Sequence, residues 1–167
     1  MIDFANPLRD RSKVSDYSFV VLRDVMQAAG VQKIIITSTA RTPLEQARIM
    51  YDNLTRYGVA HQKALYGYHG DMVIDEYVRL SKDTQRPRDA IIGGMADKIM
   101  AMGPEKISNH IADLNVLNVV DIAPSSIPSA LHASFVNAIQ ADTRVSKCHV
   151  PPRDPAFHLE IPQQVSP

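Results

Sequence analysis

Apolar residues recur at every third or fourth position in several stretches of the chain, and this spacing predicts amphipathic helices. Four helical regions are expected, at 15–30, 42–58, 61–103 (mostly helical) and 128–142. Ser15 is a favourable N-cap residue for the first helix, and Gly30 is a favourable residue at its end. These regions would supply most of the helical layer of the fold.

Four short runs rich in β-branched or aromatic residues predict strands, at 33–38, 117–123, 145–150 and 156–161. Residues 1–13 are polar and include Pro7, so they are expected to be irregular. The mixture of helices and strands predicts an α+β fold. The length of the chain favours a single domain over residues 1–167.

The composition narrows the classes of function. The 167 residues carry 18 basic and 18 acidic side chains, so no broad positive surface for nucleic acid is expected. No apolar run is long enough to cross a membrane, and no membrane insertion is expected. Residues 1–13 lack the apolar core of a signal peptide, so we expect synthesis in the cytoplasm without one. Cys148 is the one cysteine, which excludes an intrachain disulfide and a multi-cysteine zinc site.

Arg41 is expected at a corner between a strand and a helix. Thr42 and Glu45 have the spacing of a capping box and Pro43 suits the first helical position, so the helix begins directly after Arg41. A guanidinium held at such a corner can bind a carboxylate through two parallel hydrogen bonds. The alternative is a surface arginine paired with a local acid.

Two histidines and one carboxylate form the candidate metal site: His110, Asp121 and His158. Imidazole nitrogens and a carboxylate oxygen are ligands that zinc accepts, and three protein ligands leave a fourth position open for catalysis. Asp121 lies inside a predicted apolar strand, where a carboxylate is costly unless it is paired or bound to metal.

Other interpretations of these residues stay open. A salt bridge would also satisfy Asp121, and Asp113, three residues after His110, is a competing ligand. His61 and His69 are further candidate ligands, although loop histidines are more often solvated.

His158 and Glu160 are expected on one face of the last strand, because side chains two residues apart in a strand point the same way. Phe157 and Leu159 would point to the other face. This pattern suits a site built on one side of a sheet. It also suits an ordinary edge strand whose polar residues face water.

The order of these features resembles a known family. The segments concerned are Thr37-Ser38-Thr39-Ala40-Arg41-Thr42-Pro43, Ser108-Asn109-His110, a strand ending in Asp121-Ile122, and Phe157-His158-Leu159-Glu160. They resemble the zinc D-Ala-D-Ala carboxypeptidase and L,D-endopeptidase superfamily, which shares a fold with the Hedgehog signalling domain. The resemblance covers 15–48 and 108–161. It implies a small antiparallel sheet with helices packed on it, and a helical insertion at about 51–105.

In that family an arginine after the first strand binds a substrate carboxylate, and two histidines and an aspartate bind zinc. The resemblance implies the first role for Arg41 and the second for His110, Asp121 and His158. It also implies a peptidoglycan peptide as the substrate.

Two further residues are assigned to substrate binding. Ser108 stands at the serine of the family motif. His149 is a candidate for stabilising the oxyanion, and its alternative is a solvated histidine at the end of a strand.

The chain departs from the family pattern in two places. Asp121 follows His110 by eleven positions where the family has seven, and the glycine of that motif is missing. The family's catalytic glutamate precedes the last histidine by three positions, where this chain has Pro155. Asp154 and Glu160 are the candidate general bases, and Glu160 is alternatively a hydrogen-bond acceptor for a ligating histidine.

Together these features predict a zinc-dependent peptidase that hydrolyses peptide bonds in the stems or cross-links of bacterial peptidoglycan. It would act at the cell wall after release by lysis or by a secretion system. The missing glutamate keeps a second class open, a catalytically degenerate module of a phage or secretion system that binds peptidoglycan or a partner. A third class is a metal hydrolase acting on another small peptide or amide. The pattern favours no particular oligomeric state.

Overall fold

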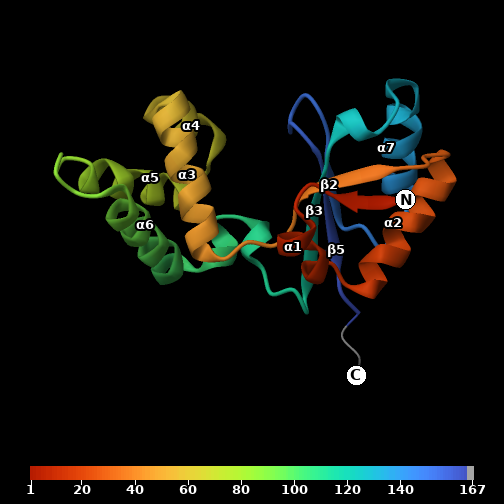
Figure 1. The fold of residues 1–167 in the computed structure, drawn as a ribbon, viewed down its shortest axis with the longest axis horizontal. Helices are drawn as coiled ribbons and strands as arrows, with labels where there is room; N and C mark the ends of the chain where they lie inside the picture. The colour runs from red at the N-terminus through yellow and green to blue at the C-terminus, as the bar shows by residue number, and fades with distance from the viewer. Residues whose placement is uncertain (165–167) are drawn as a thin grey trace. The chain divides into compact units, whose positions relative to one another are not determined.

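The computed structural model describes residues 1–164, which form two compact units (Figure 1). The first unit combines residues 1–40 with residues 112–164, and the second holds Arg41–Ile111. The single domain expected over residues 1–167 stays a prediction, and its last three residues lie outside the described range.

Five strands form the sheet of the first unit: β1 (Ile2–Phe4), β2 (Ile34–Ser38), β3 (Leu117–Ile122), β4 (Lys147–His149) and β5 (Phe157–Pro162). Their order across the sheet is β1-β2-β3-β5-β4. β1 runs parallel to β2, and the other neighbouring pairs are antiparallel. The expected α+β fold is confirmed. The sheet is mixed rather than antiparallel, because residues 2–4, expected to be irregular, add a parallel edge strand.

Two helices pack on one face of this sheet, α2 (Asp16–Ala29) and α7 (His132–Ala141) (Figure 1). The expected ends of α2 are confirmed. The Ser15 side chain accepts a hydrogen bond from the main-chain nitrogen of Ser18, and Gly30 adopts a left-handed conformation with φ of 70°. The core contains apolar residues of both layers, among them Leu22, Val25, Ile36, Val120, Phe135 and Leu159. The shorter helical segments are α1 (Pro7–Asp10) and the 3-10 turns Arg11–Lys13, Pro124–Ser126 and Ser129–Leu131.

The second unit is helical and has its own core. Its α-helices are α3 (Pro43–Tyr57), α4 (Val59–Leu65), α5 (Tyr68–Leu80) and α6 (Arg88–Met102), followed by the 3-10 turns Pro104–Lys106 and Asn109–Ile111. The predicted capping box is confirmed, since Thr42 Oγ1 accepts from the Glu45 nitrogen at 3.1 Å and the Glu45 carboxylate accepts from the Thr42 nitrogen at 2.7 Å. Buried side chains from α3, α5 and α6 include Met50, Ile74, Met95 and Ile99. Among the helices of residues 1–164, none combines the length and the apolar character that a membrane span requires.

Alternation along the strands gives the sheet two different faces. Val120, Ile122 and Leu159 are fully buried in the core that α2 and α7 share with the sheet. Their neighbours Asp121 and His158 therefore point to the opposite face. The predicted metal ligands of the strands thus lie on the face away from α2 and α7.

A buried carboxylate joins the N-terminal segment to the chain that follows β2. Asp10 is fully buried and accepts hydrogen bonds from Arg9 Nε at 2.8 Å, from Arg9 Nη2 at 2.6 Å and from Thr39 Oγ1 at 2.8 Å. Burial raises the pKa of Asp10, but the hydrogen bonds from Arg9 and Thr39 outweigh it and hold the pKa below its ordinary value. The folded chain therefore favours the ionised carboxylate.

Replacing this carboxylate should destabilise the first unit. Asp10→Asn is expected to lower the free energy of unfolding by about 1–3 kcal/mol at pH 7, because a charged buried acceptor is lost. Folding depresses the pKa of Asp10, so its stabilisation is complete above the unfolded pKa, near 3.9. It is lost as the pH falls through the lower folded value. Urea unfolding at several pH values, followed by circular dichroism, would measure this difference. Asp97→Asn, at an exposed position, is the matched control, and equal effects of the two variants would contradict the expectation.

Candidate metal centre

Three polar side chains form a row across the face of the sheet away from α2 and α7. Asp121 of β3 pairs with His158 of β5, and His158 pairs with His149 of β4. Residues directly opposite each other on neighbouring strands point to the same face and lie within contact distance. β5 is paired on both sides, so the alternative of an ordinary edge strand facing water is wrong.

His158 is held by carboxylates at both ring nitrogens. Its Nδ1 lies 2.8 Å from Asp121 Oδ1, and its Nε2 lies 3.2 Å from Glu160 Oε1. The residue is 9% exposed, so these contacts are largely shielded from water. Burial lowers the pKa of His158, but hydrogen bonding and charge interaction with Asp121 and Glu160 outweigh it and raise the pKa above its ordinary value.

Glu160 is almost completely buried, with 6% of the residue exposed. Besides His158, its Oε1 lies 3.4 Å from Nζ of Lys147, its partner on β4. A carboxylate in this position can accept the proton of His158 Nε2 and fix the orientation of the ring. That orientation leaves Nδ1 on the side of Asp121, which is the side a ligating nitrogen must face.

His149 stacks on His158, with ring centroids 5.6 Å apart and planes inclined by 25°. Burial and the positive charges of Lys147 and Arg153 lower the pKa of His149 below its ordinary value. A neutral imidazole beside His158 fits the role of a hydrogen-bonding group at the site. It is half-buried and is the last residue of β4, and its role at the site and the alternative of a solvated histidine both stay predictions.

His110 lies in the 3-10 turn Asn109–Ile111 and is 6% exposed. Its main-chain nitrogen donates a hydrogen bond to Ser108 Oγ at 3.3 Å, so Ser108 stabilises the turn. Within the described residues, one ligand atom from each of His110, Asp121 and His158 lies within 4.8 Å of the other two. The structure thus groups the three residues that the sequence predicts as ligands.

The donor set and its spacing are compatible with zinc. Tetrahedral ligands about 2.0–2.1 Å from zinc lie about 3.3 Å from one another. The 2.8 Å between His158 Nδ1 and Asp121 Oδ1 is shorter, because a hydrogen bond joins these atoms. Replacing its proton by a metal ion would require them to separate by only about 0.5 Å.

Arg41 is held within the second unit by a buried glutamine. Arg41 Nη1 donates to Gln46 Oε1 at 3.1 Å, and Gln46 Nε2 donates to the Tyr66 hydroxyl at 3.4 Å. The main-chain nitrogen of Arg41 donates to the carbonyl of His110 at 2.7 Å. Gln46 is 2% exposed, so the side chain that orients the guanidinium is itself buried in the second unit. Burial raises the pKa of Tyr66, which keeps this hydroxyl protonated.

The competing candidates have local roles. Asp113 Oδ1 accepts from the main-chain nitrogen of Asn115 at 2.9 Å, as in a turn. His61 contacts the Tyr57 ring and His69 contacts the Tyr68 ring, both in the second unit. Neither histidine belongs to the metal-ligand group found among the described residues.

Asp154, a candidate base, also has a local partner, since its Oδ1 accepts from the Ala156 nitrogen at 2.9 Å. Its charge raises the pKa of His149 and so acts against the lowering described above. Asp154 therefore lies within electrostatic reach of the row on the sheet.

Comparison of the chain with protein-family models, with curated proteins and with solved structures gives no match. The function of the chain is therefore inferred from the geometry of the site and from the order of the sequence motifs.

Three residues near the candidates are not apparent from the sequence: Gln46, Tyr66 and Lys147. Gln46 follows Arg41 by five positions on the first turns of α3, and no spacing rule marks a buried glutamine there. Lys147 would follow from the strand register, because residues two apart on β4 share the face of His149.

The contact of Gln46 with Arg41 and Tyr66 is open to test by unfolding. Gln46→Leu should lower the free energy of unfolding by about 1–3 kcal/mol, because it removes both hydrogen bonds and leaves the Tyr66 hydroxyl buried without its donor. Gln85→Leu, at an exposed site, should change it by less than about 0.5 kcal/mol. Similar small effects of both variants in urea unfolding would show that the glutamine does not hold this network.

Proposed function

We propose that this chain is a zinc-dependent peptidase that hydrolyses peptide bonds in the stems or cross-links of bacterial peptidoglycan. The grouping of His110, Asp121 and His158 ligand atoms within 4.8 Å of one another carries the proposal. The substrate class comes from the resemblance of the motifs to the D-Ala-D-Ala carboxypeptidase and endopeptidase superfamily. The α+β architecture is compatible with the Hedgehog/DD-peptidase fold, which is part of the proposal.

In this proposal His110, Asp121 and His158 hold the metal ion. Bound zinc would polarise the scissile carbonyl and lower the pKa of a water molecule toward about 7. Glu160 accepts the Nε2 proton of His158 and thereby orients the ring so that Nδ1 would face a bound metal ion. Nζ of Lys147, 3.4 Å from Glu160 Oε1, holds this buried carboxylate in place.

Arg41 binds the terminal carboxylate of the peptide, since its planar guanidinium can donate two parallel hydrogen bonds. Gln46 limits the rotation of that guanidinium by accepting from Nη1. Fixing the far end of the substrate would align the scissile bond with the metal site, which lowers the entropy cost of the reaction. Ser108 contributes through the turn that carries His110, and His149 would stabilise the developing oxyanion.

We assign the general base to Asp154. Glu160 Oε1 already contacts Nε2 of His158 and Nζ of Lys147, so we assign this carboxylate to orienting the His158 ring. Asp154 lies in the turn directly before β5 and interacts electrostatically with His149, which stacks on His158. A carboxylate there would take the proton from the attacking water and pass it to the leaving amine.

A second candidate function is a non-catalytic module that binds peptidoglycan or a partner protein. Two observations favour it: Pro155 stands where the family has its catalytic glutamate, and Asp154 Oδ1 is used to hold a turn. Such a module would bind its ligand without cleaving it.

Metal content tests the ligand assignment. The purified chain, incubated with zinc and desalted, should carry about one zinc ion per chain. Alanine at His110, Asp121 or His158 should abolish this, while Glu160→Gln should weaken zinc affinity about 10–100-fold. His149→Ala, from the same row, is the control and should retain the metal. Zinc binding that persists in all three alanine variants would place the metal elsewhere.

Mass spectrometry of digested peptidoglycan tests the activity. The zinc-loaded chain should release peptides or D-alanine, and removal of zinc with a chelator should stop the release. Asp154→Asn should reduce kcat by about 100–10,000-fold, and Arg41→Lys should raise KM by losing the bidentate contact. Asp113→Asn, which changes a turn, should retain activity.

Zinc binding together with retention on peptidoglycan, but without released fragments, would establish the binding module instead. Activity that survives in Asp154→Asn but disappears in Glu160→Gln, with zinc still bound, would transfer the base role to Glu160.

A further inference from the structure

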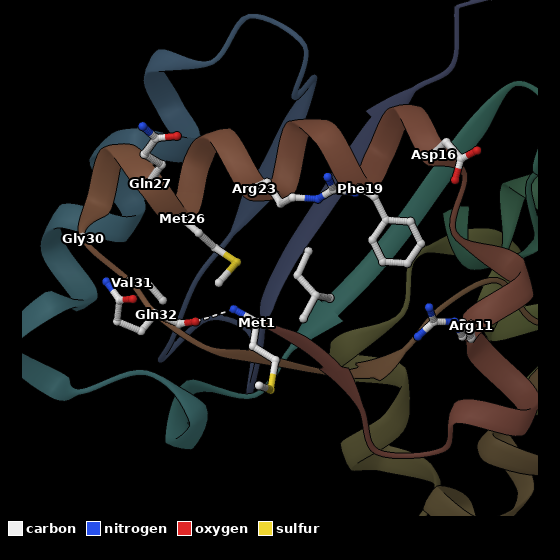
Figure 2. Close-up of a pocket in the computed structure, with 11 residues that line it drawn as sticks. Met1, Arg11, Asp16, Phe19, Arg23, Met26, Gln27, Gly30, Val31 and Gln32 are labelled. Carbon is white, nitrogen blue, oxygen red and sulfur yellow. Dashed lines mark hydrogen bonds between the residues drawn. The ribbon is translucent and has the colours of Figure 1, made fainter.

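A second site lies elsewhere in the first unit, beside α2 and the edge strand β1. Figure 2 shows a pocket of about 640 Å³ whose lining includes the start of the chain, α2 and the segment that follows it. This volume is within the range of small-molecule sites. The main-chain nitrogen of Met1 donates to the carbonyl of Gln32 and so ties the β1 end of the pocket to that segment.

One face of α2 forms the wall of the pocket. Asp16, Phe19, Arg23 and Met26 follow one another at intervals of three or four residues, which places them on the same side of the helix. In Figure 2 the Phe19 ring and the Met26 side chain project from α2 into the pocket. Phe19 also packs edge-to-face on Phe4, with centroids 6.1 Å apart, which fixes its ring. The wall therefore offers a held aromatic ring and a polarisable thioether.

Two arginines line the same pocket, Arg11 and Arg23. Over residues 1–164 neither side chain makes a hydrogen bond or an ion pair, whereas Arg9, Arg79, Arg88 and Arg144 are all paired with acids. Asp16 also lines the pocket and likewise forms no ion pair in this range, so the two arginines leave an excess of positive charge. Figure 2 shows Arg11 approaching from the segment before α2, on the side of Phe19.

We propose that this pocket binds a small aromatic anion, with its ring against Phe19 and Met26 and its carboxylate or phosphate on Arg11 and Arg23. Aromatic rings and methionine sulfur favour contact with an aromatic ligand. Planar guanidinium groups match carboxylate and phosphate oxygens. The site does not depend on the metal centre, because Asp121 and His158 lie on the face of the sheet away from α2.

The test is a titration of the full ¹⁵N-labelled chain, without added metal, followed by amide chemical shifts. The probes are 3-phenylpropionate, phenyl phosphate and the neutral 3-phenylpropionamide. Both anions should shift the amides of Phe19, Arg23, Met26 and Val31 with a saturable Kd below about 10 mM. The neutral amide should bind at least about tenfold more weakly than either anion, because it lacks the charged hydrogen bonds. A preference between the two anions would identify the group that the arginines recognise.

Variants locate the binding site. Arg11→Gln with Arg23→Gln should weaken both anions about tenfold or more, and Phe19→Leu should weaken all three probes. Arg48→Gln, an exposed arginine on α3, is the matched control and should leave binding unchanged. Amide spectra of each variant verify folding. The absence of saturable shifts at these amides, equal affinity for the neutral probe, or unchanged binding in the double variant would each overturn the proposal.

Discussion

The double hydrogen bond of His158 is the interaction on which the candidate centre depends. A histidine inside a buried strand can direct only one nitrogen at a ligand, and its other nitrogen must be satisfied by the protein. Here Glu160 lies at Nε2 and Asp121 lies at Nδ1, both supplied by the sheet. The antiparallel register of β3 and β5 places Asp121 opposite His158, so the geometry of the site follows from backbone pairing.

Local sequence chemistry predicts much of the scaffold. The N-cap Ser15, the terminal Gly30 and the capping box at Thr42 are confirmed, because each acts through main-chain groups a few residues away. The strand β1 was missed because it has three residues, too few for alternation to be visible, and its parallel pairing with β2 depends on the tertiary fold. The strand β4 lies within the strand predicted at 145–150, but its pairing with β5, which removes β5 from the edge of the sheet, depends on the tertiary fold.

The candidate site is partly predictable from local sequence patterns as well. Strand periodicity places His158 and Glu160 on one face, and the cost of an acid in an apolar run singles out Asp121. The partnership of Glu160 with His158 was one of two alternatives in the sequence, and the 3.2 Å contact favours it over the role of base. Gln46 was missed because contacts between α3 and the corner at Arg41 depend on packing rather than on spacing.

A crystal structure of the chain grown with zinc, with diffraction data collected at the zinc absorption edge, tests the metal centre most directly. The account predicts one anomalous peak within about 2.0–2.2 Å of donor atoms from His110, Asp121 and His158, with Glu160 on the other nitrogen of His158. A zinc peak held by other residues, or intact hydrogen bonding of His158 to Asp121 at saturating zinc, would contradict it.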